Sequence, residues 1–380
     1  MKKILIVFLS LFVILPSQAK VKTKDINFPK HFYTNQIKTC SFVGDESFKS
    51  GYTKNRIESL VELDWMSEWA KGNSRSVNHE NLTGPMTLFA VTAHVAIGNN
   101  DRDEINLAKE ILIKMAKADI LYDTISRKEL KKKPRCWKDG NPESPCWYHA
   151  YEFARDAFTN YLIIAIYLKE QLTKEEFKTI DKYIKKMYKK FLKPIQFRKN
   201  DKGFYAMANG GLSTLIYASW TEDKKLAAKE INHTFKEIDR LFYDDGYIND
   251  NSFRGFRGQW YHSYAVDNAL GYVYIAKLWG ATVPQNIQDK LVNSAKVVNL
   301  AITDPKKFLE RKNPNGLARN RITDPKKARP HTHQMAIAID TLMEIVTGVK
   351  LEHDPIYLKK RKYHTPDGID NLIGFNPNCI

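Results

Sequence analysis

Two arginines, a histidine and two tyrosines lie together in one short segment of this 380-residue chain. Arg254 precedes Tyr261 by seven residues, and Arg257 precedes Tyr264 by the same spacing. A helix that begins near Gln259 would place both tyrosines on one face, with the arginines in the loop that leads into it. Arginine grips carboxylates and tyrosine can transfer protons, so the segment suits proton abstraction next to a carboxylate.

The elements that must position this segment are helices. Apolar residues recur at helical spacing, with glycine and proline clusters between the periodic ranges. No break in composition marks a second domain, so we expect one all-α domain over residues 20–380. The predicted helical ranges are 57–69, 86–97, 105–117, 150–172, 174–191, 211–219, 226–242, 261–278, 287–300 and 334–347.

The length of this domain favours a particular helical architecture. Single cores stop growing at about 250–300 residues, a size that simple bundles rarely exceed. Helical hairpins arranged as an α/α toroid, an incomplete α/α barrel, solve this problem. Such a fold gathers loops at one end of a groove, where function tends to concentrate.

The first 19 residues have the pattern of a secretory signal peptide. Two lysines are followed by an apolar run over residues 4–15 and by the small-residue sequence Pro16-Ser-Gln-Ala19. The run is shorter than the roughly 18 residues that a membrane span needs. We expect a periplasmic or secreted protein that begins near Lys20 and does not insert into a membrane.

Four cysteines in an exported chain are typical of disulfides. Cys136 and Cys146 bracket a short loop, which favours a local bridge and leaves Cys40 to pair with Cys379. Four cysteines allow three connectivities, so the other two pairings remain open. The spacing does not match a zinc site, and no metal is expected.

The formal net charge is +17 at pH 7, in a chain that is 43% hydrophobic and 12% aromatic. Such an excess favours a polyanionic partner. An exported protein without a nucleic-acid motif is a poor candidate for nucleic acid, whereas an acidic polysaccharide suits both the charge and the aromatic rings. The alternative is that lysine simply fills exposed helix faces.

The run from Arg254 to Tyr264, continued by Ala-Val-Asp-Asn-Ala-Leu270, resembles the Arg…Tyr-His-x-Tyr-Ala signature of alginate lyases of polysaccharide lyase family five and their superfamily. Residues 63–70 and 78–84 resemble the family's early helix and the Asn-His-Thr-Gly segment of its substrate cleft. Residues 242–247 resemble the Asp-Gly-Phe element that precedes the catalytic strip. The resemblance implies an α/α toroid that cleaves alginate.

The resemblance also implies roles for individual residues. Asn209 and Arg254 would neutralise the substrate carboxylate, and Tyr261 would act as acid or base. The family's histidine, which is linked to proton abstraction, corresponds here to Gly210. His149, which opens a helix beside the loop of Cys136 and Cys146, is the leading substitute, with a structural histidine as the alternative.

The chemistry of β-elimination explains these residue types. Removal of the C5 proton of a uronate places negative charge on its carboxylate, which Arg254 and Asn209 can stabilise. Tyr261 can take the proton and return one to the glycosidic oxygen, because a neighbouring arginine favours its phenolate form. The reaction needs no metal or organic cofactor.

Other polar residues are expected to bind the substrate, and each has a structural alternative. Tyr261 and Tyr264 could be core aromatics, Arg257 could brace the loop, and Arg254 could pair with Asp244, Asp245 or Asp250. An ideal helix turns His262 about 100° away from Tyr261, which suits a structural role. The predicted substrate-binding residues are Arg257, Tyr264, His262, His79, Tyr148, Arg319, Arg321 and His331.

Two other classes of function compete with a lyase. A glycoside hydrolase needs two carboxylates, for which Asp156, Asp244 and Asp245 are candidates, but the arginine–tyrosine strip has no place in that mechanism. A periplasmic binder of acidic glycans would use the same arginines without a poised tyrosine. We expect a monomeric lyase acting on polymannuronate-rich alginate, with polyglucuronate as the second substrate choice.

Overall fold

The described part of the structure is helical. The computed structural model describes residues 20–29, 82–132, 147–199, 202–205, 210–315 and 335–362. Within these ranges, the only β-type pairing is one isolated antiparallel bridge between Phe242 and Ile248. The all-α prediction is confirmed.

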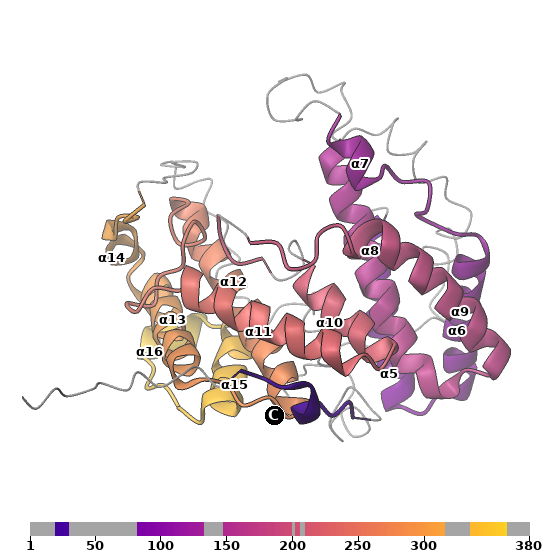
Figure 1. Ribbon diagram of the computed structural model, residues 1–380. Helices are drawn as coiled ribbons and strands as arrows, with labels where there is room; N and C mark the ends of the chain where they lie inside the picture. The colour runs from indigo at the N-terminus through magenta and orange to yellow at the C-terminus, as the bar shows by residue number, and fades with distance from the viewer. Residues whose placement is uncertain are drawn as a thin grey trace, which may run out of the picture.

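The longer helices are α5 (Gly84–Gly98), α6 (Arg102–Lys117), α8 (Trp147–Leu168), α9 (Lys174–Met187), α10 (Gly211–Trp220), α11 (Lys224–Leu241), α12 (Phe256–Leu278), α13 (Gln285–Thr303) and α15 (Ala336–Thr347) (Figure 1). The short helices are η1 (Thr23–Asp25), α7 (Arg127–Leu130), η3 (Lys169–Gln171), η4 (Tyr188–Leu192), α14 (Pro305–Glu310) and α16 (Pro355–Lys360). Every predicted helical range after residue 82 is confirmed. The range 57–69 lies outside the described residues.

Polar residues at the starts of several helices explain where they begin. Asp101 accepts hydrogen bonds from two backbone amides in the first turn of α6. Thr173 and Glu176 form a reciprocal capping box at α9, and Ser126 forms one with Glu129 at α7. These side chains bond amides that have no partner within the helix.

The helices pair as hairpins in two layers. α5 packs on α6, α10 on α11 and α12 on α13. One layer continues through contacts of α5 with α8, α8 with α10 and α12 with α15, and the other through α6 with α9 and α11 with α13. Closure of these hairpins into the predicted toroid stays a prediction.

Burial distinguishes the two layers. α9 buries Ile180, Tyr183, Ile184 and Met187, one stripe at helical spacing, and its other residues are more exposed. α5 instead buries a nearly continuous run from Phe89 to Ala96. A helix that is apolar on all sides belongs in a core, and an amphipathic one covers it.

The segment 20–29 packs against two of the later helices. Asn232 of α11 exchanges two hydrogen bonds with the backbone of Val21, at 3.0 and 2.8 Å. Ile26 is fully buried, and the amide of Asn27 donates to the carbonyl of Trp279 at 2.8 Å. The segment is therefore docked on α11 and on the end of α12. None of the helices in the described ranges has the length and apolar character to cross a membrane.

The turn between α11 and α12 positions the candidate site. The amide of Asn249 donates to the carbonyl of Leu241 at 2.9 Å, which folds the chain back on the end of α11. Gly246 has a φ of +86°, and a Cβ there would lie 2.3 Å from the carbonyl oxygen of Asn293 on α13. Only glycine fits this approach, so the turn is held tightly against α13.

Candidate functional site

Four side chains from two segments form the candidate site, which we call the Arg254 cluster: Tyr205, Asp250, Arg254 and Tyr261. Nη2 of Arg254 lies 2.5 Å from Oδ2 of Asp250, and Nε lies 3.2 Å from the same oxygen. The guanidinium carbon is 4.1 Å from the ring centre of Tyr261 and 5.6 Å from that of Tyr205. The hydroxyl of Tyr205 donates to Oδ2 of Asp250 at 3.2 Å. One cation therefore joins a carboxylate and two phenol rings.

The buried carboxylate fixes the cation of this cluster. Asp250 is buried and has a φ of 59°, in the left-handed region that side chains rarely adopt. The side chain of Arg254 is 16% exposed and Tyr205 and Tyr261 are half-buried, so all members of the cluster except Asp250 reach the surface. Of the alternatives for Arg254, the pairing with Asp250 is the one that the structure contains. Arg254 is thus oriented by a neighbour in its own turn.

Two pKa shifts follow from this environment. Burial raises the pKa of Tyr205, Arg254 opposes this shift, and Asp250 adds to it. Tyr205 is therefore held as a neutral phenol that donates to Asp250. Burial disfavours the charge of Arg254, but the interactions of the guanidinium with Tyr205, with the Asp250 carboxylate and with Tyr261 outweigh it and raise the pKa of Arg254. The guanidinium is a permanent cation.

A buried amide connects the two segments of the cluster. Oδ1 of Asn251 accepts a hydrogen bond from the amide of Phe204 at 2.8 Å, and Nδ2 donates to the carbonyl of Tyr261 at 3.2 Å. Gly203 allows this approach, since a Cβ there would lie 2.3 Å from Oδ1 of Asn251. Asn251 thereby holds the segment with Tyr205 against the start of α12.

One face of the first turns of α12 is half-buried and aromatic, and we call it the α12 strip: Arg257, Trp260, Tyr261 and Tyr264. The ring of Trp260 stacks on Tyr264 with centres 5.2 Å apart and meets the edge of Tyr261 at 4.9 Å. Arg257 lies in the first turn, because α12 begins at Phe256 and not near Gln259. The expectation that Arg257 is a loop residue is wrong, and the shared face of Tyr261 and Tyr264 is confirmed.

His262 faces the opposite way. It has no exposed surface, its Nδ1 accepts from the hydroxyl of Ser252 at 2.8 Å, and its Nε2 donates to the carbonyl of Ser294 at 3.0 Å. Burial lowers its pKa to about 4, which the bond to Ser294 only partly opposes. The prediction that His262 contacts the substrate is wrong. It is a neutral core histidine that joins α12 to α13.

His149 is the one further predicted site residue whose side chain the structure describes. His149 is half-buried in the first turn of α8, with its ring centre 6.4 Å from that of Phe153. Its role in place of the family histidine stays a prediction. The remaining predicted site residues and cysteines lie outside the described residues, as does the side chain of Tyr148: Asn209, His79, Arg319, Arg321, His331, Cys40, Cys136, Cys146 and Cys379.

The carboxylates proposed for a hydrolase are engaged in ion pairs. Asp156 lies 2.9 Å from Nη2 of Arg155, and Asp245 lies 2.7 Å from Nε of Arg311. The side chain of Asp244 is 96% exposed. A general acid of a hydrolase needs an environment that keeps its carboxyl protonated. Neither the cations beside Asp156 and Asp245 nor the exposure of Asp244 supplies one.

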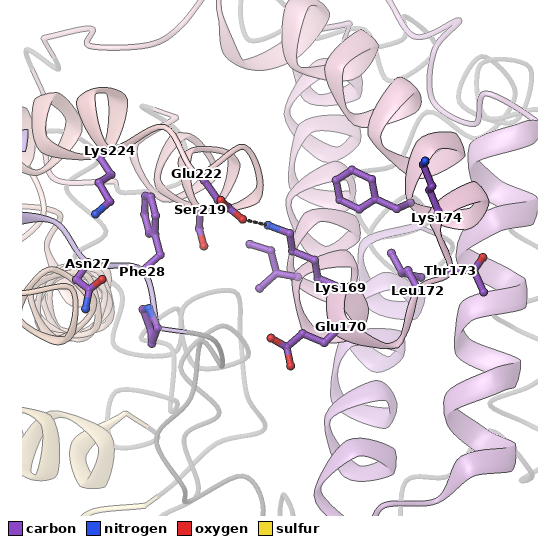
Figure 2. A pocket seen from close by; sticks show the side chains of 13 residues that line it. Asn27, Phe28, Lys169, Glu170, Leu172, Thr173, Lys174, Ser219, Glu222 and Lys224 are labelled. Atoms are coloured by element: carbon purple, nitrogen blue, oxygen red, sulfur yellow. Dashed lines mark hydrogen bonds and ion pairs between the residues drawn. The ribbon is translucent and has the colours of Figure 1, made fainter.

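A separate cavity of about 640 Å³ lies between the segment 20–29 and the ends of α8, α9 and α10. Figure 2 shows Phe28 and Lys224 on one side, Lys174 on the other, and the ion pair of Lys169 with Glu222 between them. The two charged groups of this pair are 3.0 Å apart. The described lining contains no arginine, histidine or tyrosine, so this cavity lacks the residue types of the predicted chemistry.

Comparisons of the chain with known proteins gave no match. No protein-family model matches it, and no curated protein matches it significantly. The resemblance to alginate lyases therefore stays a prediction that rests on its motifs.

Tyr205, Asn251 and Trp260 are site residues that sequence reasoning missed. Trp260 adjoins the predicted strip, and its aromatic ring beside Tyr261 was a visible signal. Asn251 belongs to a run of polar residues before α12, which indicated a bonded turn. Tyr205 had no local signal, because it reaches the cluster only through pairing of segments 47 residues apart.

Proposed function

We propose that this protein is a polysaccharide lyase that cleaves a polyuronate by β-elimination. The guanidinium of Arg254, 4.1 Å from the ring centre of Tyr261, carries the proposal. A fixed cation beside the ring can stabilise negative charge that develops in the transition state of a proton transfer. Tyr261 is therefore the base, and the acidic C5 proton of a uronate is its target.

Arg254 and Arg257 have different roles in the proposed reaction. Nε and Nη2 of Arg254 face Asp250, so Arg254 orients and polarises Tyr261. Arg257 precedes Tyr261 by four residues on the α12 strip, and its buried Nε has no hydrogen-bond partner among the described residues. An arginine in this position can grip the substrate carboxylate and stabilise the charge that grows there. Asn209 is the second donor that we expect.

The reaction is balanced without another reactant. Tyr261 takes the C5 proton, the C4–O bond breaks, and the electron pair of the C5–H bond becomes the C4–C5 double bond. The phenol then returns a proton to the leaving glycosidic oxygen. One product carries a new unsaturated uronate end, and the other carries a new reducing end.

The α12 strip supports a sugar polymer as substrate. Trp260 and Tyr264 are stacked and half-buried, and aromatic faces of this kind can pack against sugar rings. Polymannuronate-rich alginate is the first substrate that we propose, on the motif resemblance, and polyglucuronate is the second.

An elimination assay tests the proposal. Purified protein is incubated separately with polymannuronate, polyguluronate and polyglucuronate, and the ultraviolet absorbance of the unsaturated product is followed beside a reducing-end assay. We expect both signals with polymannuronate, and neither with Tyr261→Phe. Tyr217→Phe is the matched control, because Tyr217 stacks on Tyr188 and is remote in sequence from the α12 strip.

Other outcomes would replace the proposal. New reducing ends without ultraviolet absorbance would indicate a hydrolase. Binding of polymannuronate without either product would indicate a glycan-binding protein that uses the same strip. Equal activity of wild type and Tyr261→Phe would exclude Tyr261 as the base.

A further inference from the structure

A second cationic surface is formed by residues between Tyr122 and Arg198. It is formed by the connection between α6 and α7, by α7, and by α9 with η4. Two hollows of about 650 and 340 Å³ share Ser126, Lys189 and Lys190 in their linings. Together they are lined by nine lysines and arginines, and none of the described lining residues is acidic.

Tyr122 organises this surface, which we call the Tyr122 surface. Nζ of Lys186 lies 3.5 Å from the centre of its ring, and Nζ of Lys190 lies 4.6 Å from it. Lys190 also donates to the carbonyl of Tyr122. The ring remains 38% exposed. One aromatic side chain thus gathers two ammonium groups and still presents apolar surface to solvent.

The positive charge of the Tyr122 surface is only partly neutralised. Asp119 lies 2.6 Å from Nζ of Lys186, and Asp181 lies 2.7 Å from that of Lys185. Lys182 and Lys189 form no ion pair with any described residue. They share a face with Lys186, because residues four and seven apart align along a helix. Like charges in such a row repel, and a bound anion would relieve the repulsion.

Lys190 is the most enclosed ammonium group of this surface to show a pKa shift. Burial is the main cause that lowers its pKa, Glu129 and Asp123 oppose the shift, and Lys186 adds to it. Glu129 is itself engaged, since its carboxylate accepts from the amide of Ser126 at 2.8 Å. Glu129 and Asp123 therefore offset part of the lysine charge, but neither residue lines the two hollows.

We propose that the Tyr122 surface binds a second stretch of the polyuronate chain, at a place distinct from the Arg254 cluster. Figure 1 shows α7 and α9 at one side of the molecule and α12 and α14 toward the other. A polymer with one carboxylate on each sugar matches a row of ammonium groups, and an exposed tyrosine ring can pack on a sugar face. The inference rests on the proposed function, because that function names the polymer.

A binding measurement tests this inference independently of cleavage. Affinity for long polymannuronate chains is measured in the Tyr261→Phe background, so that the polymer stays intact. One variant combines Lys182→Gln, Lys186→Gln and Lys189→Gln. The control removes the same charge from exposed lysines of α11, α13 and α16 through Lys225→Gln, Lys296→Gln and Lys359→Gln. We expect about a tenfold loss of affinity for the first and less than twofold for the control, since each exposed ion pair contributes modestly.

The outcomes separate the two proposals. Equal weakening by both sets of substitutions would overturn the inference, as would tighter binding to anionic lipid vesicles or single-stranded DNA than to polymannuronate. In proteins that retain Tyr261, both sets of lysine substitutions should leave the rate of cleavage of a short mannuronate oligomer at the wild-type value. Loss of polymer binding in a protein that cleaves no polyuronate would support the Tyr122 surface and overturn only the lyase function.

Discussion

Tyr261 and His262 are neighbours on α12, yet they lie in opposite environments. Tyr261 is half-buried against the guanidinium of Arg254. His262 is fully buried, with one ring nitrogen bonded to Ser252 and the other to Ser294. Both residue types transfer protons in enzymes. Their surroundings decide that the tyrosine is available for chemistry and that the histidine joins two helices.

One turn supports both environments. Asp250 fixes Arg254 beside Tyr261, Asn251 binds the carbonyl of Tyr261, and Ser252 donates to His262. Three consecutive polar residues of the turn therefore bond different parts of α12: Asp250 bonds its surface face through Arg254, Asn251 bonds its backbone, and Ser252 bonds its buried face. A change in this turn should affect both faces, whereas a change in either side chain should affect one.

The first prediction is that substitution of Tyr261 lowers activity and that substitution of His262 lowers stability. Tyr261→Phe keeps the ring that contacts Arg254 and removes the proton-transferring hydroxyl, so elimination should fall by about 10²–10⁴-fold. Its free energy of unfolding should change by less than about 0.5 kcal/mol. His262→Ala leaves a cavity and removes the hydrogen bonds to Ser252 and Ser294, and should lower the free energy of unfolding by about 3 kcal/mol.

Urea unfolding and product absorbance per folded molecule measure the two effects. Folded His262→Ala should retain elimination within a few-fold of wild type, because the histidine does not reach the surface. A stable but inactive His262→Ala protein would reverse the comparison and make the histidine part of the chemistry.

The second prediction disturbs both faces at once. A Cβ on Gly258 would lie 2.5 Å from the backbone carbonyl oxygen of Ser252, so Gly258→Ala must displace the turn. We expect a loss of about 2 kcal/mol in the free energy of unfolding, with reduced elimination in the folded fraction. Gly348→Ala is the control. A Cβ added at Gly348 would meet no atom within 4 Å. The positive φ of this residue disfavours alanine, so the variant should lose stability and keep its rate of elimination.

Much of the fold could be predicted because helical periodicity is a local property. The ranges of the long described helices followed from apolar spacing, and only short helices such as α7, α14 and α16 were missed. The candidate site was predictable in part. Arg254, Arg257, Tyr261 and Tyr264 lie within one segment, and their spacing placed the two tyrosines on a common helix face. Arg257 shares that face only because α12 begins at Phe256, which the spacing did not predict.

The rest of the site depends on contacts that local pattern does not contain. Tyr205 joins Arg254 only because Asn251 binds the backbone of Phe204, across 47 residues of chain. The burial of His262 follows from the position of α13, which supplies Ser294. A histidine flanked by tyrosines resembles a catalytic residue until the helix that covers it is known.

The third prediction uses pH to separate the faces, and its effect is the smallest. The pKa of His262 is lowered to about 4 in the folded protein, against about 6.5 in an unfolded chain. Between these values the unfolded chain binds a proton that the folded protein does not. Stability from this group is therefore fully present above about pH 6.5 and is lost as the pH falls toward 4, by at most about 1.4 kcal/mol per pH unit.

Urea unfolding at pH 7 and pH 5 measures this loss, with His262→Gln as the matched variant. Glutamine does not titrate, so the variant should lose less stability between the two pH values than wild type. Buried His94, whose pKa is also lowered by burial, contributes equally to both proteins and cancels in the difference. Tyr261→Phe should follow the wild-type acid profile, since its ring lies on the other face. An unchanged profile in His262→Gln would mean that the imidazole takes up a proton in the folded protein as readily as in the unfolded chain, and would overturn the prediction.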